Sequence, residues 1–308
     1  MTVALVTGLT GFIGRHLASA LRSDGVEVVG VTRNAAHAAN IDNVFIGDIK
    51  NRTFVSDLVQ QVRPDIVFHL AANKSRTGDV EEFRSGLEDN LFGTLNLAEA
   101  CVKSAQIQRF VSLGTCEEYG NAGPIFHEEM RESPVSAYSL SKTSVTHLLQ
   151  TVYRTLDFPV VVLRPSLAFG PGQATDMFLP ALIQALLAGK RFAMSGGEQT
   201  RDYVYIDDLI EAILLASTKS EAIGKLINIS SGVPVLLKEV AKLTARKISR
   251  DAENLLDIGK KDYRVNEIMD YAASRELAEK LLGWLPCTSL DDGLTATVEY
   301  YRRLSVDN

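Results

Sequence analysis

The sequence has few residues of the kinds that hold metals or form covalent cross-links. It contains only three cysteines, Cys101, Cys116 and Cys287, among 308 residues, and no two of them form a C-x-x-C pair. Such wide spacing indicates neither a zinc site nor a disulfide framework. The five histidines also lack metal-ligand spacing, so the sequence predicts no metal centre.

Long apolar runs and an excess of positive charge are missing as well. No stretch approaches the roughly 18 apolar residues that cross a membrane. The net charge is −6, and no basic stripe of the kind that nucleic-acid binders carry is visible. The first residues read as a strand rather than as the basic start of a signal peptide. We therefore expect a cytoplasmic protein that binds neither membranes nor nucleic acids.

Short apolar runs alternate with helical patterns along the first half of the chain. A continuous apolar run is typical of a strand buried on both faces, and apolar residues three or four apart are typical of one helical face. Strands are predicted near residues 3–6, 26–31, 43–46, 66–68, 110–111 and 160–163, and helices over 12–21, 91–102, 135–156 and 179–187. This alternation predicts an α/β fold of the Rossmann type, with a doubly wound parallel sheet.

The pattern changes after Arg164, where Pro165, Gly170 and Pro171 indicate that the chain leaves the sheet. We expect residues 1–165 to form a dinucleotide-binding domain, rejoined by about 202–230. Residues 166–201 and 231–308 are expected to form a smaller C-terminal substrate-binding lobe.

A glycine-rich segment follows the first strand and opens the first helix. Gly8 permits a tight turn, Gly11 lets a pyrophosphate approach the backbone, and Gly14 lets the helix pack closely on the sheet. The helix N-terminus then offers free N–H groups to the phosphates. Because the segment lies between a buried strand and an amphipathic helix, it predicts a dinucleotide site rather than a simple connecting turn.

The end of the second strand bears on the choice between NAD and NADP, because an acid there binds the ribose 2′-hydroxyl. Here the strand runs into Thr32 and Arg33 without an acid. A guanidinium suits a 2′-phosphate in charge and geometry, so Arg33 favours NADP(H) over NAD(H); the alternative is an exposed loop arginine. Asp48 follows the third strand, where it either accepts a hydrogen bond from adenine or simply flanks a helix.

A tyrosine and a lysine four residues apart form the centre of the predicted catalytic site. Tyr138 and Lys142 lie on one helical face, and a neighbouring ammonium favours the phenolate form of tyrosine. Thr115 follows a predicted strand and is placed to hydrogen-bond a substrate oxygen. Glu117 is a candidate second acid or base, unless it and the next glutamate lie in a solvated loop. Cys116 is expected to be a packed residue rather than a nucleophile.

Together these features resemble the extended short-chain dehydrogenase/reductase family of nucleotide-sugar enzymes, also called the NAD-dependent epimerase/dehydratase family. The resemblance covers nearly the whole chain. The matching segments are 7–14, 69–72, 90–97, 115–120, Tyr138 with Lys142, 164–165, 170–173, 201–208 and 282–284.

The family resemblance implies a role for each matching residue. The expected catalytic residues are Thr115, Tyr138 and Lys142, with Glu117 as the further candidate. The expected cofactor-binding residues are Gly8, Thr10, Gly11, Phe12, Ile13, Gly14, Arg33, Asp48, Ile49, Leu70, Ala71, Ala72, Tyr138 and Lys142. The expected substrate-binding residues are Lys74, Thr115, Arg201 and Arg264, of which the two arginines hold a diphosphate. Asp207 and Asp208 are expected to be helix caps. The family also implies a homodimer, formed through the helices that contain Asn96 and Tyr153.

Two departures from the family pattern affect the predicted reaction. Leu167 stands where many members have an asparagine, which puts one substrate contact in doubt. The triplet Thr115-Cys116-Glu117 differs from the Thr-Asp-Glu that dehydratases often have, whereas some 4-keto-6-deoxyhexose reductases have a similar run that ends Glu-Glu-Tyr-Gly. The short chain and Arg33 also favour a reductase, so the favoured hypothesis is the NADPH-dependent 4-keto reduction of a nucleotide-linked 4-keto-6-deoxyhexose, with Tyr138 as proton donor.

Three other hypotheses remain open. A nucleotide-sugar dehydratase would recycle its cofactor and use Glu117 as a base. A 4-epimerase would need no second acid–base pair. A dinucleotide-sensing regulator could share the fold without being an enzyme, although it would have little need for Thr115, Tyr138 and Lys142 together.

Overall fold

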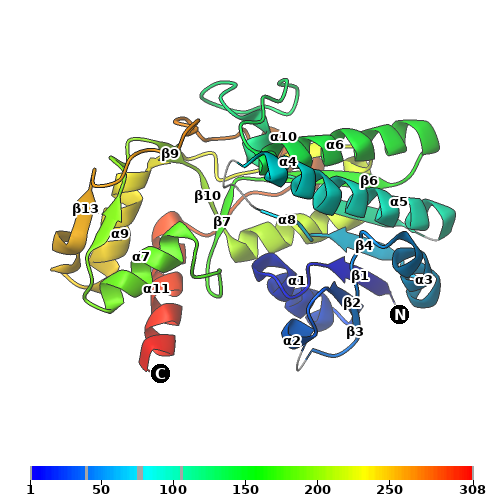
Figure 1. The fold of residues 1–308 in the computed structure, drawn as a ribbon, viewed down its shortest axis with the longest axis horizontal. Coiled ribbons are helices and arrows are strands. Elements are labelled where there is room, and N and C mark those ends of the chain that lie inside the picture. Colours follow the sequence, from blue (N-terminus) through cyan, green and yellow to red (C-terminus); the bar gives the residue numbers. More distant parts are fainter. Residues whose placement is uncertain (1, 39–40, 75–78, 105–106, 307–308) are drawn as a thin grey trace.

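A computed structural model of the chain describes residues 2–38, 41–74, 79–104 and 107–306. Figure 1 shows a large sheet-centred lobe and a smaller lobe built around α7, α9 and α11. The larger lobe contains a seven-stranded parallel sheet with the strand order β11-β6-β5-β4-β1-β2-β3. Its strands are β1 (Val3–Thr7), β2 (Glu27–Thr32), β3 (Val44–Ile46), β4 (Ile66–His69), β5 (Arg109–Leu113), β6 (Val160–Pro165) and β11 (Leu226–Ile229).

Alternate residues of the strands pack against helices on opposite faces of the sheet. Ala4 and Val6 of β1 join the core that includes α1 and α8, whereas Leu5 joins the core that includes α3, α5 and α6. Figure 1 shows α5 and α6 on one side of the sheet and α1 and α8 on the other. The helices of this lobe are α1 (Phe12–Ser23), α2 (Ala35–Ala38), α3 (Arg52–Val62), α4 (Val80–Gly86), α5 (Gly93–Ser104), α6 (Ala137–Leu156), α8 (Ile206–Thr218) and α10 (Glu276–Leu282). The predicted doubly wound Rossmann-type sheet is confirmed.

The strand order reverses between β1 and β4, and this reversal positions the site. Neighbouring strands there lead to connections on opposite faces, which opens a crevice at the carboxyl ends of the strands. Short helical turns flank the crevice: the π-helical turn η1 (Leu87–Phe92) leads into α5, and the 3₁₀ turn η2 (Cys116–Tyr119) follows β5.

The smaller lobe is formed by the later part of the chain. Its core joins α7, α9 and β8 through Leu182, Met194 and Ala241. Three two-stranded sheets pair β7 with β10, β9 with β12, and β8 with β13. The elements are β7 (Leu167–Phe169), α7 (Phe178–Leu187), β8 (Phe192–Met194), β9 (Thr200–Arg201), β10 (Tyr203–Tyr205), β12 (Val235–Leu236), α9 (Leu237–Ile248), η4 (Ala252–Leu255), β13 (Leu256–Ile258) and α11 (Leu290–Val306). The 3₁₀ turn η3 (Ser220–Ala222) instead follows α8 and packs in the core of the larger lobe.

No helix among the described residues has the length and apolar character needed to cross a membrane.

Candidate active site

A cleft of about 650 Å³ lies at the carboxyl ends of the central strands. Its lining includes the glycine-rich segment, the ends of β2 and β4, the segment after β5, the start of α6, and β7. All of the predicted cofactor-binding and catalytic residues therefore meet in one cavity. The predicted site residues in its lining are Gly8, Thr10, Gly11, Phe12, Ile13, Gly14, Arg33, Asp48, Ile49, Leu70, Ala71, Ala72, Lys74, Thr115, Glu117, Tyr138 and Lys142.

The glycine-rich segment is shaped in a way that requires glycine. Gly8 has φ +73°, and a Cβ there would lie 2.8 Å from the backbone nitrogen of Ala71. A Cβ on Gly14 would lie 2.2 Å from the carbonyl oxygen of Gly8. Glycine at these positions lets the segment fold tightly between β1 and α1, and the segment lines the cleft at the start of α1, where free N–H groups meet the positive end of the helix dipole. This cradle fits the pyrophosphate of a dinucleotide.

Two cations lie near the expected adenosine end of the cleft. Arg33 is largely exposed and approaches Asp89 at 3.5 Å, while the Lys50 ammonium lies 2.7 Å from the same carboxylate. Burial alone would raise the pKa of Asp89, but the hydrogen bonds and positive charges of Lys50, Asn73 and Arg33 together outweigh burial, so the pKa is lowered. Asn73 also donates to Asp89. Because Asp89 already accepts from these neighbours, it is poorly placed to act as the acid that binds a ribose 2′-hydroxyl.

The predicted catalytic residues surround the middle of the cleft. Tyr138 and Lys142 come from the first turns of α6, and Thr115 is the N-cap of η2. The Lys142 ammonium is 2 % exposed and donates to the carbonyl oxygen of Leu113 at 2.5 Å. Burial lowers the pKa of Lys142 to about 8. Glu117 is half-buried in the cleft lining, so it does not lie in a freely solvated loop.

Cys116 is packed in the protein and faces away from this chemistry. Its side chain is fully buried, and its Sγ donates to the carbonyl oxygen of Arg164. Burial raises the pKa of the thiol well above its usual value. The expectation of a packed rather than nucleophilic cysteine is confirmed.

A buried hydrogen-bonded chain, which the sequence analysis did not find, links the glycine-rich segment to α6. The ring of His69 bonds the hydroxyls of Thr7 and Thr94, each at 2.7 Å, and Thr94 donates to the backbone of Asn90. The Asn90 amide in turn donates to Ser141, which lies between the two predicted catalytic residues of α6. Burial lowers the pKa of His69 to about 3, so the imidazole is neutral and acts as a structural link.

The part of the cleft beside β7 contains several apolar side chains. Leu167, Ala168 and Met177 belong to its lining together with Gln173 and Lys74. Leu167 thus places an apolar side chain in the cleft at the position where many family members have an asparagine. An apolar wall of this kind suits a part of a ligand that lacks a hydroxyl group.

The two predicted diphosphate arginines do not belong to the cleft lining. Arg201 is paired with Glu267 and donates to the carbonyl oxygens of Thr200 and Ile268. Its guanidinium also lies 5.7 Å from the ring centre of Tyr271. Arg264 is exposed in the loop that contains Glu267. A diphosphate held by Arg201 would have to replace the Glu267 carboxylate.

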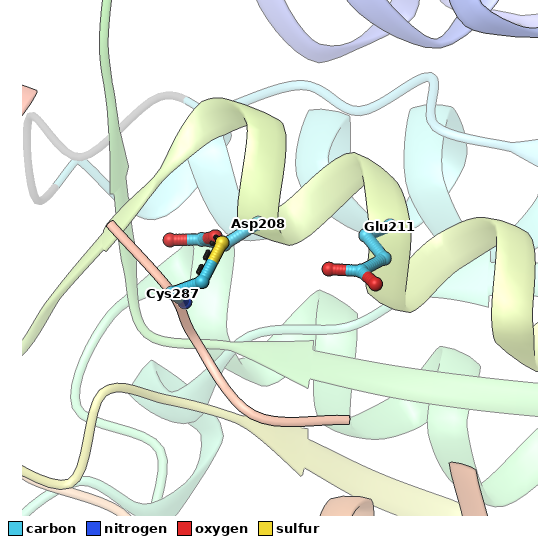
Figure 2. A group of neighbouring side chains, drawn as sticks. All are labelled: Asp208, Glu211 and Cys287. Atoms are coloured by element: carbon cyan, nitrogen blue, oxygen red, sulfur yellow. Dashed lines mark hydrogen bonds between the residues drawn. The ribbon is translucent and has the colours of Figure 1, made fainter. Parts of the chain in front are cut away.

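Outside the cleft, the described residues contain one group of ligand-type side chains, Asp208, Glu211 and Cys287 (Figure 2). Asp208 accepts hydrogen bonds from the backbone of Cys287 and Thr288 and from the Cys287 thiol. The prediction that Asp207 and Asp208 are helix caps is wrong, because α8 has Tyr205 as its N-cap and no side-chain cap hydrogen bond. The Asp208 carboxylate instead anchors the C-terminal segment. Its oxygens already serve this structural contact.

Comparison with known proteins supports the resemblance noted in the sequence. A model of the NAD dependent epimerase/dehydratase family matches residues 4–230. The chain is 30% identical to the uncharacterized UDP-glucose epimerase YtcB of Bacillus subtilis over 97% of this chain and 98% of that one. It is 29% identical to a dTDP-D-glucose 4,6-dehydratase of Dictyostelium discoideum over 77% of this chain, and there it spans about 60% of the relative's length.

Solved structures with the same fold include nucleotide-sugar enzymes. A UDP-glucose 4-epimerase of Thermotoga maritima, solved with UDP-glucose, has a TM-score of 0.91 and 28% identity over 99% of this chain and 100% of that one. A UDP-glucuronic acid 4-epimerase of Bacillus cereus, in complex with UDP-glucuronic acid and NAD, has a TM-score of 0.89 and 30% identity over 98% of this chain and 100% of that one.

Proposed function

The chain belongs to the NAD dependent epimerase/dehydratase family, and from this membership we propose that it is an NAD(P)-dependent enzyme acting on a nucleotide-linked sugar. Its relatives are dehydratases and epimerases of such sugars, and solved relatives bind NAD and uridine-diphosphate sugars. The glycine cradle at Gly8 and Gly14 fits the dinucleotide, and Thr115, Tyr138 and Lys142 meet beside it. Within this class we propose the reduction of a nucleotide-linked 4-keto-6-deoxyhexose.

The main observation in favour of the proposed reaction is where the carboxyl groups lie in the cleft lining. Dehydration needs a base for the carbon-bound hydrogen and an acid for the departing hydroxide. In the described cleft lining, the carboxyl groups are Asp48 and Asp89 near the expected adenosine end, and Glu117 beside Thr115. The neighbouring position is Cys116, which is buried and turned away. A reduction needs one proton donor, and Tyr138 can supply it without a second acid–base pair.

Each residue of the site has a distinct task in the proposed reaction. Bound NADPH would supply the hydride for C4 of the sugar. Tyr138 donates the proton to the C4 oxygen, and the Thr115 hydroxyl holds that oxygen by a hydrogen bond. Lys142 favours the phenolate that Tyr138 leaves behind, because its buried positive charge lies one helical turn away. The apolar Leu167 and Met177 suit the C6 methyl group of a deoxy sugar.

NADP(H) is proposed as the preferred cofactor. Arg33 and Lys50 place two positive charges near the expected ribose, and the first residues after β2 include no acid. A 2′-phosphate would compete with Asp89 for these cations, whereas a 2′-hydroxyl would gain little from them.

A 4-epimerase is the second candidate function. Epimerisation at C4 needs Tyr138 to remove and return one proton, and no second acid–base pair. Glu117, the single glutamate of the described cleft lining, is compatible with it, and the structural relatives named above are 4-epimerases.

The net consumption of NADPH during turnover distinguishes a reductase from a dehydratase or an epimerase. Purified protein incubated with NADPH and a nucleotide-linked 4-keto-6-deoxyhexose should lose one NADPH absorbance equivalent for each product formed. A dehydratase or an epimerase instead converts a nucleotide-linked sugar that carries no keto group, without net change in the cofactor. We expect Glu117→Gln to retain most of the reductase rate, and Tyr138→Phe to abolish it. Turnover without cofactor loss, combined with a Glu117→Gln rate about 10² to 10⁴ lower, would establish the dehydratase.

A further inference from the structure

Asp89 is a carboxylate of the cleft lining that has no task in the proposed reaction. It lies in the π-helical turn η1, and its side chain is 16 % exposed. The next residue, Asn90, accepts the backbone N–H of Asn73 at 2.7 Å and donates to Ser141 at 2.8 Å. These two bonds tie the turn to the segment after β4 and to α6. The Asp89 carboxylate is therefore held in place in the lining.

The two oxygens of the Asp89 carboxylate have different partners. Oδ1 lies 2.7 Å from the Lys50 ammonium, and Oδ2 accepts from Nδ2 of Asn73 at 3.1 Å. The guanidinium of Arg33 contacts Oδ2 as well, but at 3.5 Å and from a side chain that is 62 % exposed. Lys50 and Asn73 thus hold Asp89 more closely than Arg33 does. Arg33 can turn toward a ligand while the carboxylate keeps its other two partners.

The ion pairs at this end of the cleft join two cations to two carboxylates, so their charges cancel. Lys50, which contacts Asp89, also lies 3.9 Å from Asp48, and Arg33 is the second cation. The end of β2, which Arg33 follows, is where a dinucleotide fold places the adenosine ribose. A 2′-phosphate on that ribose would bring close to two negative charges into a group that has no net positive charge.

We propose that Asp89 is a specificity-determining residue for the cofactor, because its fixed carboxylate opposes the same 2′-phosphate that Arg33 attracts. This inference rests on the proposed binding of a dinucleotide in the cleft. The ribose 2′-hydroxyl of NAD carries no charge, so Asp89 does not oppose it. Arg33 and Asp89 act on one phosphate in opposite directions, and the balance between them sets how strongly the protein distinguishes NADP from NAD.

The test measures the Kd values of NADP⁺ and NAD⁺ by isothermal titration calorimetry, for the unmodified protein and for Asp89→Asn. The two ligands differ only in the 2′-phosphate, so the ratio of their Kd values isolates its contribution. Asparagine keeps the shape of the side chain and an oxygen that can accept from Asn73, but it removes the charge. We expect Asp89→Asn to lower the Kd of NADP⁺ roughly tenfold and to change that of NAD⁺ by less than about twofold.

Glu99→Gln is the matched control. Glu99 lies on α5 outside the cleft lining, and its carboxylate also pairs with two cations, Arg52 and Lys103. Both Kd values should therefore stay as in the unmodified protein. If Asp89→Asn does not fold, Asp89→Ser also removes the charge and should show the same gain in NADP⁺ affinity. The gain should shrink at high salt, because the charges that produce it are partly exposed.

The calorimetric measurement needs no sugar, so it separates this inference from the proposed reaction. An unchanged or raised NADP⁺ Kd in a folded Asp89 variant would overturn the role of Asp89, and so would an equal gain for NAD⁺ or in Glu99→Gln. If the unmodified protein binds NAD⁺ more tightly and Asp89→Asn still gains affinity for NADP⁺, the role of Asp89 stands and the proposed NADP preference is wrong. A protein that binds neither dinucleotide would refute both.

Discussion

At the scale of single residues, Arg33 is the side chain on which the proposed cofactor preference depends. It is 62 % exposed and held loosely by Asp89, so it can turn to a 2′-phosphate at little structural cost. A charge-assisted hydrogen bond of this kind contributes about 1.5 kcal/mol, or roughly tenfold in affinity. We expect Arg33→Ala to weaken NADPH binding about tenfold and to leave NADH binding unchanged, as measured by fluorescence titration.

The control for this prediction is Arg303→Ala, which removes another exposed arginine from the far end of α11. It should bind both cofactors as the unmodified protein does. NADH that binds more tightly than NADPH, with no effect of Arg33→Ala, would assign the protein to NAD instead. The weakness of the exposed Arg33 contact also implies a preference that decreases at high salt.

At the scale of elements, β9 carries Arg201, which lies outside the cleft lining and is paired with Glu267. We expect Arg201→Ala to raise the substrate KM by about 30-fold, because a desolvated guanidinium–diphosphate contact is worth about 2 kcal/mol. NADPH affinity should not change. The control is Arg191→Ala, which breaks an exposed ion pair with Asp257 in the same lobe. An unchanged KM in Arg201→Ala would mean that the arginine serves the Glu267 loop alone.

The elements of the fold were largely predictable because their signals are local. The predicted helix over 12–21 is observed as α1 (Phe12–Ser23), and the predicted strand over 26–31 is observed as β2 (Glu27–Thr32). A parallel strand that is buried on both faces needs a continuous apolar run, and such a run is visible in the sequence. The predicted helix over 91–102 is less regular, because the π-helical turn η1 (Leu87–Phe92) precedes α5 (Gly93–Ser104).

What the sequence could not predict depends on contacts between distant segments. The π-helical turn contains Asn90, whose side chain bonds Asn73 and Ser141, 17 and 51 residues away. Similarly, Glu118 is buried because Arg164 lies 46 residues further along the chain. One local signal for Glu118 was present, since Thr115 followed three residues later by a glutamate is a capping-box pattern. The pairing of Arg201 with Glu267 had no such local sequence signal.

At the scale of the whole molecule, the outer surface beside α5 carries apolar side chains that the monomer does not bury. Phe92 and Leu95 are 52 % and 39 % exposed on neighbouring turns, and Phe83 of α4 is 39 % exposed. Large side chains of this kind, gathered on adjacent helical segments, are typical of a subunit interface. They support the proposed homodimer through α5 and α6, the longest helix of the sheet-centred lobe.

This arrangement gives a direct prediction for the assembly. Two glutamates in place of Phe92 and Leu95 would put opposing negative charges into a symmetric interface, and each charge would appear twice. We expect the double variant Phe92→Glu/Leu95→Glu to be monomeric in sedimentation velocity, whereas the unmodified protein and Leu285→Glu should sediment as dimers. Leu285 is 45 % exposed and lies outside these helices, so it tests whether any added surface charge has the same effect. A protein that sediments as a monomer before any substitution, or a dimer that survives both glutamates, would show that these side chains do not form the interface.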